Sequence, residues 1–360
     1  LDNMGQSEYA ITELVGILNE EPRHLATIQA LYRLYGKVGR LRDAEKLILP
    51  LVDKDPENYN WPNMLFLIYQ AGKEVDLAMK YGEEAARRCN YNEIVVDSVL
   101  KAGLQFGQYD RVLAFINNTL PADKRNTPLV LIRTAAAYVN KGQRPQAMAI
   151  YNNILDAARD NLERFANIAY DLKNTMGADV AAEMLRQRLA KDPNDRGSKL
   201  VLAMFQKDAG NSEALGSIAE ELLKAIPPES KENANRLFLM RSLAVIRYQA
   251  GKWEEARTIY DQMLKLDPNH VIALNNLAYL LLEDLHDAKK ALEYAKRAAE
   301  ILPQDTNVLD TLGWSQIVAG EYDDGISTLR RASGIEESTA AVHYHLAEAF
   351  FRRSSTSDTT

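Results

Sequence analysis

Apolar side chains recur at helical spacing along nearly the whole chain, and glycine or proline interrupts them at regular intervals. Near the start, Ile28, Leu31 and Tyr35 follow the i, i+3, i+7 spacing of a helix with one apolar face. Gly39 then breaks the pattern, and a second apolar face begins at Ala44. This alternation predicts two amphipathic helices joined by a short turn.

Prolines mark the ends of these helix pairs at a nearly constant distance. Pro22 and Pro56 are 34 residues apart, and Pro193 and Pro227 are again 34 residues apart. Proline disfavours helix in the residue before it and is accepted in the first turn of the next helix. The sequence therefore predicts an all-α fold, built as an array of helix pairs with one unit every 34 residues or so.

Several features of the unit resemble the tetratricopeptide repeat family. They are the period, a small residue such as Gly313 in the first helix, an alanine such as Ala256 in the second helix, and the closing proline. The resemblance covers nearly the whole chain. It implies an α-solenoid in which the pairs stack into a right-handed superhelix, with the first helices forming the concave wall where partners bind.

The spacing also sets the expected boundaries of the array. We expect a single array over residues 1–353, with half a repeat at 1–24, about nine repeats over 25–339 and half a repeat at 340–353. The tail 354–360 is rich in serine and threonine and is expected to be disordered. Arrays normally end in a polar capping helix. The half repeats therefore predict a fragment of a longer protein, or ends that another molecule covers, including pairing into a homo-oligomer.

Two irregularities stand out within the array. The repeat at 93–127 is the weakest, and its second helix is expected to be cut short near Pro121. The distance from Pro227 to the next closing proline predicts an insertion near 228–236. That insertion is expected either to lengthen the helix that follows it or to form a loop.

Composition and charge exclude several classes of function. The formal net charge is −7 and no dense lysine or arginine block occurs, which argues against nucleic acid as the partner. No stretch of about 18 apolar residues is present, so no direct membrane insertion is expected. Cys89 is the only cysteine, which rules out an intramolecular disulfide and a four-cysteine zinc site. The compartment stays open between the periplasm and the cytoplasm, and we expect a soluble protein in either.

Motifs that carry chemistry are missing from the sequence. There is no glycine-rich phosphate loop, no Gly-x-Ser-x-Gly elbow and no His-Glu-x-x-His pair. His343 and His345 are two residues apart on an expected helix and point in different directions, so they do not suit one metal ion. The sequence therefore predicts no catalytic residue, no metal, no cofactor and no enzyme activity.

The resemblance assigns the second, fifth, ninth and twelfth residues of each first helix to the concave wall. In the last repeats these positions combine aromatic, amide and charged side chains, which suits a peptide or helix from another protein. For Tyr279 and Trp314, packing against the adjacent repeat is the alternative role. The candidate partner-binding residues are Phe238, Arg241, Tyr248, Asn275, Tyr279, Asn307, Asp310, Trp314 and Tyr344.

The family's clamp for the C-terminal carboxylate of heat-shock chaperones is incomplete in this sequence. Arg241 and Asn276 match part of the clamp, but Asn307 and Thr311 stand where the remaining cations are required. A chaperone-tail adaptor is therefore disfavoured.

Three functions are compatible with these features. The first is a non-catalytic scaffold that binds a partner peptide or helix in the concave groove. The second is a periplasmic or outer-membrane-associated component of a bacterial export or polysaccharide-secretion system, because residues 273–281 and 309–314 look like bacterial arrays of that kind. The third is the substrate-selecting arm of a larger enzyme. The sequence names neither the partner nor its conformation.

Overall fold

The computed structural model describes residues 3–227, 232–335 and 339–357. Across these residues the chain forms helices and turns, with no β-strand. The chain divides into two compact units. The first contains Leu1–Ala157 and Asn174–Gly177, and the second contains Ala158–Lys173 and Ala178–Thr360.

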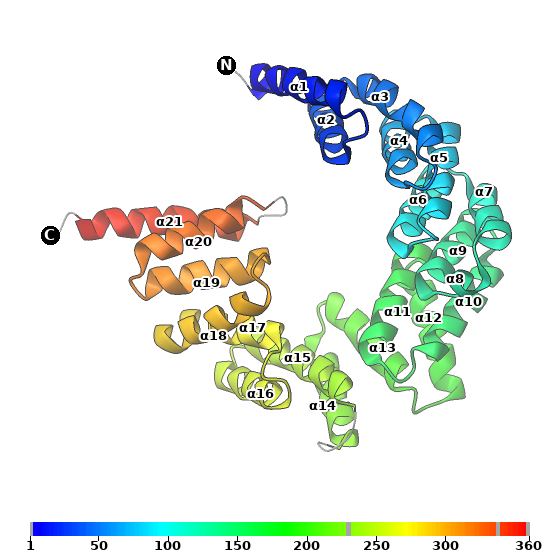
Figure 1. Ribbon diagram of the computed structural model, residues 1–360. Helices are drawn as coiled ribbons and strands as arrows, with labels where there is room; N and C mark the ends of the chain where they lie inside the picture. The colour runs from blue at the N-terminus through cyan, green and yellow to red at the C-terminus, as the bar shows by residue number, and fades with distance from the viewer. Residues whose placement is uncertain (1–2, 228–231, 336–338, 358–360) are drawn as a thin grey trace. The chain divides into compact units, whose positions relative to one another are not determined.

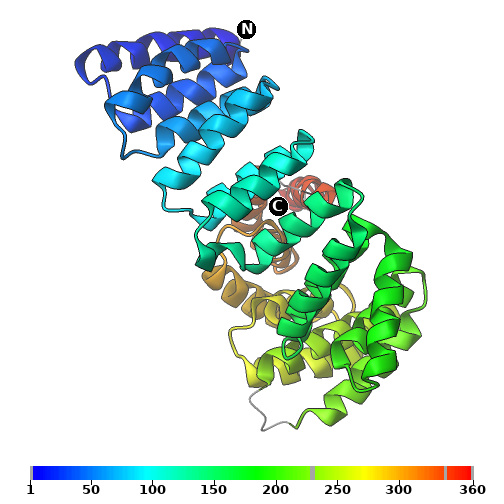
Figure 2. The same cartoon turned by 90° about the vertical axis from the view of Figure 1, so that its right-hand side faces the viewer.

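The first unit is a stack of short helices lying side by side (Figure 2). Its core contains aromatic side chains from successive helices, including Trp61, Phe66 and Tyr69. The helices are α1 (Asn3–Glu20), α2 (Leu25–Lys37), α3 (Leu41–Lys54), α4 (Asn60–Ala71), α5 (Val75–Arg88), α6 (Glu93–Gln105), α7 (Tyr109–Ala114), α8 (Ala122–Arg125), α9 (Pro128–Asn140) and α10 (Arg144–Ala157).

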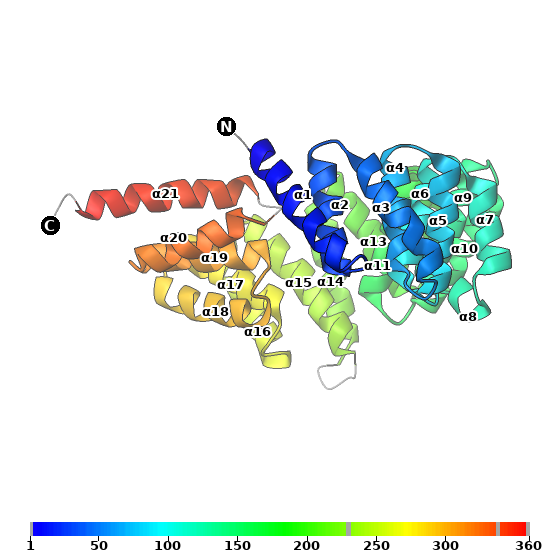
Figure 3. The same cartoon turned by 45° about the horizontal axis from the view of Figure 1, so that its top comes forward.

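The second unit continues the same construction, with consecutive helices packed in pairs (Figure 1). Its last helix lies against the two helices before it (Figure 3). The helices are α11 (Leu162–Met176, of which 162–173 belong here), α12 (Ala178–Lys191), α13 (Arg196–Asp208), α14 (Ser212–Ala225), α15 (Asn233–Gln249), α16 (Trp253–Leu266), α17 (Val271–Glu283), α18 (Ala288–Ile301), α19 (Thr306–Val318), α20 (Tyr322–Ser333) and α21 (Ala340–Ser357). The predicted all-α array of helix pairs is confirmed.

Small residues let paired helices approach closely. Gly313 on α19 faces Gly325 on α20, and a Cβ placed on Gly325 would lie 2.6 Å from Cδ1 of Ile317 and 2.9 Å from the carbonyl oxygen of Gly313. In the first unit a large side chain on one helix packs against a glycine on its partner. There the ring of Phe66 on α4 lies 2.9 Å from the Cβ position of Gly82 on α5. A large side chain on one helix is thus matched by the absence of one on its partner.

The repeat at 93–127 departs from the regular pair, as its sequence predicts. After α7 the chain forms a π-helical segment, Phe115–Thr119, and Pro121 then stands before the short α8. Phe115 and Ile116 of the π-helical segment are buried. The wider turn therefore keeps apolar side chains in the core where the second helix ends early.

The expected insertion and the expected disordered tail differ in outcome. Residues 228–231 of the insertion lie outside the described residues. The remainder belongs to α15, which has 17 residues where α17 has 13, so the helix after the insertion is lengthened. The helix α21 extends to Ser357 and so includes the first residues of the tail for which disorder is expected. Residues 358–360 lie outside the described residues.

The first helices of the second unit are also tied together beyond the nearest neighbour. The side chain of Asn235 at the start of α15 accepts a hydrogen bond from the backbone N–H of Leu162 at 2.9 Å and donates one to the carbonyl of Asp160 at 2.9 Å. Asn235 is buried and satisfies a free N–H at the start of α11. This bond fixes the starts of α11 and α15 next to each other.

Candidate partner-binding site

Three hollows lie along the first helices of the second unit. The first has a volume of about 180 Å³ and is lined from α11, α15 and the start of α17. The second, of about 210 Å³, is lined from α11, α13, α14, α15 and α17, and the third, of about 390 Å³, from α17 and α19 together with the loop between α18 and α19. Arg241 lines both the first and the second hollow, and Asn276 lines both the second and the third. The three hollows therefore form one continuous inner face.

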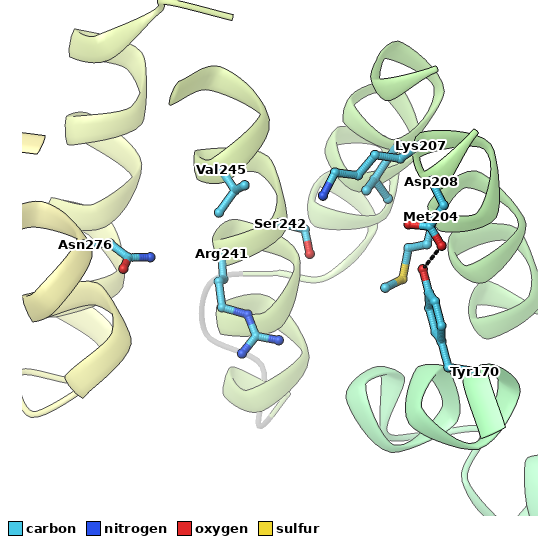
Figure 4. Close-up of a pocket in the computed structure, with 9 residues that line it drawn as sticks. Tyr170, Met204, Lys207, Asp208, Arg241, Ser242, Val245 and Asn276 are labelled. Carbon is cyan, nitrogen blue, oxygen red and sulfur yellow. Dashed lines mark hydrogen bonds between the residues drawn. The ribbon is translucent and has the colours of Figure 1, made fainter. Parts of the chain in front are cut away.

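The second hollow carries charged and polar side chains from several helices (Figure 4). The Tyr170 hydroxyl donates a hydrogen bond to Asp208 at 2.9 Å, and the Lys173 ammonium binds the same carboxylate oxygen at 2.7 Å. Burial first, and then this carboxylate, raise the pKa of Tyr170. Figure 4 shows Lys207 reaching from α13 toward α15, while Arg241 and Asn276 extend into the same space from α15 and α17.

Arg241 is held at the junction of the first two hollows. Its guanidinium lies 3.1 Å from Glu163 of α11 and 5.1 Å from the centre of the Phe238 ring. Phe238 itself is buried. The aromatic ring and the carboxylate fix the direction of the guanidinium, and the Arg241 side chain remains partly exposed to solvent.

The third hollow combines amide and carboxyl groups with an exposed aromatic ring. It is lined by Asn275, Tyr279, Asn307 and Asp310, all of which were predicted from the sequence. The Tyr279 side chain is 39% exposed. The side-chain oxygen of Asn275 is buried and accepts no hydrogen bond from the described residues. A buried acceptor without a donor is costly, so the hydrogen-bonding capacity of the Asn275 side chain is not filled within the described residues.

Two tyrosines stand together beside the third hollow. Tyr248 of α15 and Tyr279 of α17 pack edge to face, with ring centres 6.5 Å apart. Burial, and then the Asp284 carboxylate, raise the pKa of Tyr248 to about 12. Burial also raises the pKa of Tyr279. The negative charges of Glu283, Asp284 and Asp310 raise it further. The hydroxyl groups therefore lie in a region of negative potential.

Trp314 lies underneath α21 and not on an open surface. Only 6% of it is exposed, and its indole N–H donates a hydrogen bond to Glu283 at 2.6 Å. The ring of His345 stacks on the indole with centres 4.8 Å apart, and the Arg352 guanidinium lies over the ring at 4.6 Å. His345 also binds Asp310 through Nδ1 at 2.8 Å. Trp314 is therefore packed against the following first helix, with little surface left for a ligand.

The structure brings together most of the residues selected from the sequence, but not all of them. Phe238 and Arg241 meet in the first hollow, and four others meet in the third. Tyr344 is 66% exposed and lines none of the hollows. Sequence reasoning left out Asp208 and Ser242, which line the second hollow one position after Lys207 and Arg241. Only their position next to Lys207 and Arg241 could have indicated them, because the concave positions include just a narrow stripe of each first helix.

No group of three metal-ligating side chains exists within the described residues. The Cys89 thiol is half-buried and lies 3.4 Å from the carbonyl oxygen of Ala86. None of the described helices combines the length and the hydrophobicity needed to cross a bilayer.

Part of the second unit is similar to a known repeat family. Residues 242–306, which include much of α15 and all of α16, α17 and α18, match the family model for the tetratricopeptide repeat. Cellulose synthase operon protein C of Pseudomonas fluorescens strain SBW25 is 23% identical over 345 residues, which cover 90% of this chain and 26% of that protein. The photosystem I assembly protein Ycf3 of Prochlorococcus marinus strain NATL1A is 30% identical over 110 residues, which cover 30% of this chain and 62% of that protein.

Solved structures of helical repeats are similar at a lower level. One is the C-terminal part of a tetratricopeptide repeat protein from Cytophaga hutchinsonii, with 15% identity and a TM-score of 0.40, covering 69% of this chain and 99% of that chain. Another is the repeat domain of P58(IPK), with 15% identity and a TM-score of 0.31, covering 92% of this chain and 98% of that chain. The chain spans about a quarter of the length of the cellulose synthase operon relative.

Proposed function

We propose that this chain, a tetratricopeptide repeat array, is a non-catalytic scaffold that holds a segment of another protein against the inner face of its second unit. The observation that carries the proposal is the continuous series of three hollows along α11, α13, α15, α17 and α19. Binding sites for other chains are commonly concave, and a few well-placed polar groups orient the ligand within them. The hollows have this character.

An extended segment fits this face better than a helix does. The hollows follow one another from one first helix to the next, so a ligand that occupies all three must cross several helices. An extended chain exposes backbone N–H and C=O groups along its length, and the Asn275 side chain, whose oxygen has no donor among the described residues, lines the third hollow that such a chain would cross. The exposed ring of Tyr279 offers an apolar contact beside it.

A second candidate function rests on the relative from Pseudomonas fluorescens. The likeness to that relative runs through 90% of this chain, and its name connects it with a cellulose synthase operon. We infer that the chain is one segment of a longer protein in a bacterial polysaccharide-secretion system. The scaffold function and this setting are compatible, because a scaffold within such a system holds another component of it.

Site-specific crosslinking tests the scaffold function. A photoreactive phenylalanine analogue replaces Tyr279 in one variant and Trp253 in a control variant, and each is irradiated in lysate of the organism that encodes the chain. The two residues have similar exposure, 39% and 42%, but Trp253 stands at the start of the second helix α16 and lines none of the hollows. We expect one protein to be captured from position 279 and not from position 253.

Equal capture at both positions would contradict the proposed site, because contact would then not depend on the inner face. Capture of nothing at position 279, with the protein folded by circular dichroism, would contradict the scaffold function at this face.

A further inference from the structure

The second and third hollows carry opposite charge, although they adjoin each other at Asn276. The lining of the second hollow includes Lys207 and Arg241 against the single carboxylate of Asp208. The lining of the third includes Asp305 and Asp310, with no lysine or arginine among its residues. The formal charge therefore changes from +1 to −2 between neighbouring hollows, counted over the ionisable lining residues.

The positive charge of the second hollow is available to a ligand. Asp208 is hydrogen-bonded to Lys173 and Tyr170 and also feels the charge of Lys207, so one carboxylate faces two ammonium groups and offsets only one of them. Lys207 itself forms no hydrogen bond or ion pair with any part of the chain that the structure describes. Arg241 contacts Glu163 through one terminal nitrogen, and its other N–H groups remain for a second acceptor.

The negative charge of the third hollow is likewise only partly compensated. Asp305 accepts hydrogen bonds from the backbone N–H groups that begin α19, and Asp310 binds His345, which adds a cation only when it is protonated. The Asp284 carboxylate, with one oxygen buried and unpartnered among the described residues, adds negative charge near Tyr248 and Tyr279. The exposed ring of Tyr279 stands against these carboxylates, an arrangement that favours a lysine or arginine side chain.

We propose that the inner face of the second unit selects an extended segment with an acidic residue in the second hollow and a lysine or arginine in the third. This inference rests on the proposed scaffold function and specifies its partner. Packed helices lie about 8–10 Å apart, so the cations on α13 and α15 and the carboxylates of α19, two or three first helices away, are separated by about 16–30 Å. An extended chain advances about 3.3 Å per residue, which places the two charged residues about five to nine positions apart.

Opposite charges at two fixed points set the register of the bound segment. A segment that slides along the face, or that has both charges of one sign, brings like charges together in one of the hollows. Such juxtaposition discriminates against wrong partners more strongly than the matching pair adds affinity.

Selection from a peptide library tests the charge rule directly. A phage library displaying random peptides of about twelve residues is selected on the wild-type chain and on the Lys207→Gln/Arg241→Gln variant. The control is Lys224→Gln/Lys265→Gln, which removes the same charge from exposed positions on the second helices α14 and α16. Thermal unfolding of all three proteins verifies that each is folded.

We expect wild type and control to enrich peptides with an acidic and a basic residue about five to nine positions apart. The Lys207→Gln/Arg241→Gln variant loses the acidic preference and keeps the basic one. Synthetic copies of the enriched peptides are expected to bind this variant about three- to tenfold more weakly than wild type, as the loss of two partly exposed charge contacts predicts.

Enrichment of peptides without paired charges, or an unchanged preference in the variant, would overturn the charge rule and leave the scaffold function standing. Enrichment of nothing by the wild-type chain would overturn both.

Discussion

Tyr279 and Trp314 occupy the same position of consecutive repeats, 35 residues apart, yet one is open and the other is covered. Tyr279 on α17 is 39% exposed at the edge of the third hollow, whereas Trp314 on α19 is 6% exposed beneath His345 and Arg352 of α21. The repeat position thus fixes the direction of a side chain from its helix. The next first helix decides whether that direction ends in solvent or in a neighbour.

The largest test of this comparison is Trp314→Ala. Removing a buried indole, with its hydrogen bond to Glu283, is expected to lower the free energy of unfolding by about 3–5 kcal/mol. The matched change Tyr279→Ala is expected to cost less, about 1 kcal/mol, because 39% of the residue is exposed and less contact is lost. Urea unfolding of the two variants measures both values, and equal losses would contradict the distinction between a covered and an open position.

The close pairing of α19 with α20 is the next feature that can be broken. Gly325→Ala places a methyl group 2.6 Å from Ile317 and 2.9 Å from a backbone oxygen, so we expect a loss of about 1–3 kcal/mol. Gly216 of α14 is the control, because a Cβ there meets nothing nearer than 3.8 Å. Gly216→Ala is expected to stabilise the chain by about 0.5–1 kcal/mol through helix propensity. Changes of the same sign in both variants would show that the glycine contact does not limit packing.

The smallest expected effect is a pH dependence of the free energy of unfolding, caused by Tyr248, which packs against the open Tyr279. Tyr248 has a pKa of about 12 in the folded chain, above its ordinary value of 10.0. The folded state therefore holds this proton more tightly than the unfolded state. Its contribution to stability is fully present below pH 10 and is lost between about pH 10 and 12. Tyr248→Phe is expected to make the decline of unfolding free energy over that range shallower, and an identical decline would contradict the assignment.

Local pattern was sufficient to predict the fold. The proline spacing and the apolar stripes identified the helix pairs, and Pro121 marked the place where the second helix of the repeat at 93–127, which begins as α7, ends early. The apolar stripes depend on residues within a few helical turns, and the proline spacing depends on residues within one repeat. The π-helical turn at Phe115–Thr119 was not predicted, because it depends on how Phe115 and Ile116 reach the core.

The candidate site could be predicted only in part, for a related reason. The concave positions located Arg241, Asn275 and Tyr279 on the hollows, because helical geometry sets which face they share. Burial of Trp314 depends on side chains of α21, about 30 residues further along the chain or more, and no local pattern contains that information. The partition of charge between the hollows likewise depends on which carboxylates find internal partners.

The bond from Asn235 to the start of α11 has a consequence for how the array unfolds. In an ideal repeat array each unit touches only its neighbours, and the stability is a sum of single units and adjacent interfaces. Asn235 of α15 reaches back past the helix pair α13–α14 to Asp160 and Leu162 at the start of α11. That pair therefore lies between two points that are tied directly together. Local fraying of that pair therefore leaves its flanks joined, and the segment from α11 to α15 is expected to open as one cooperative block.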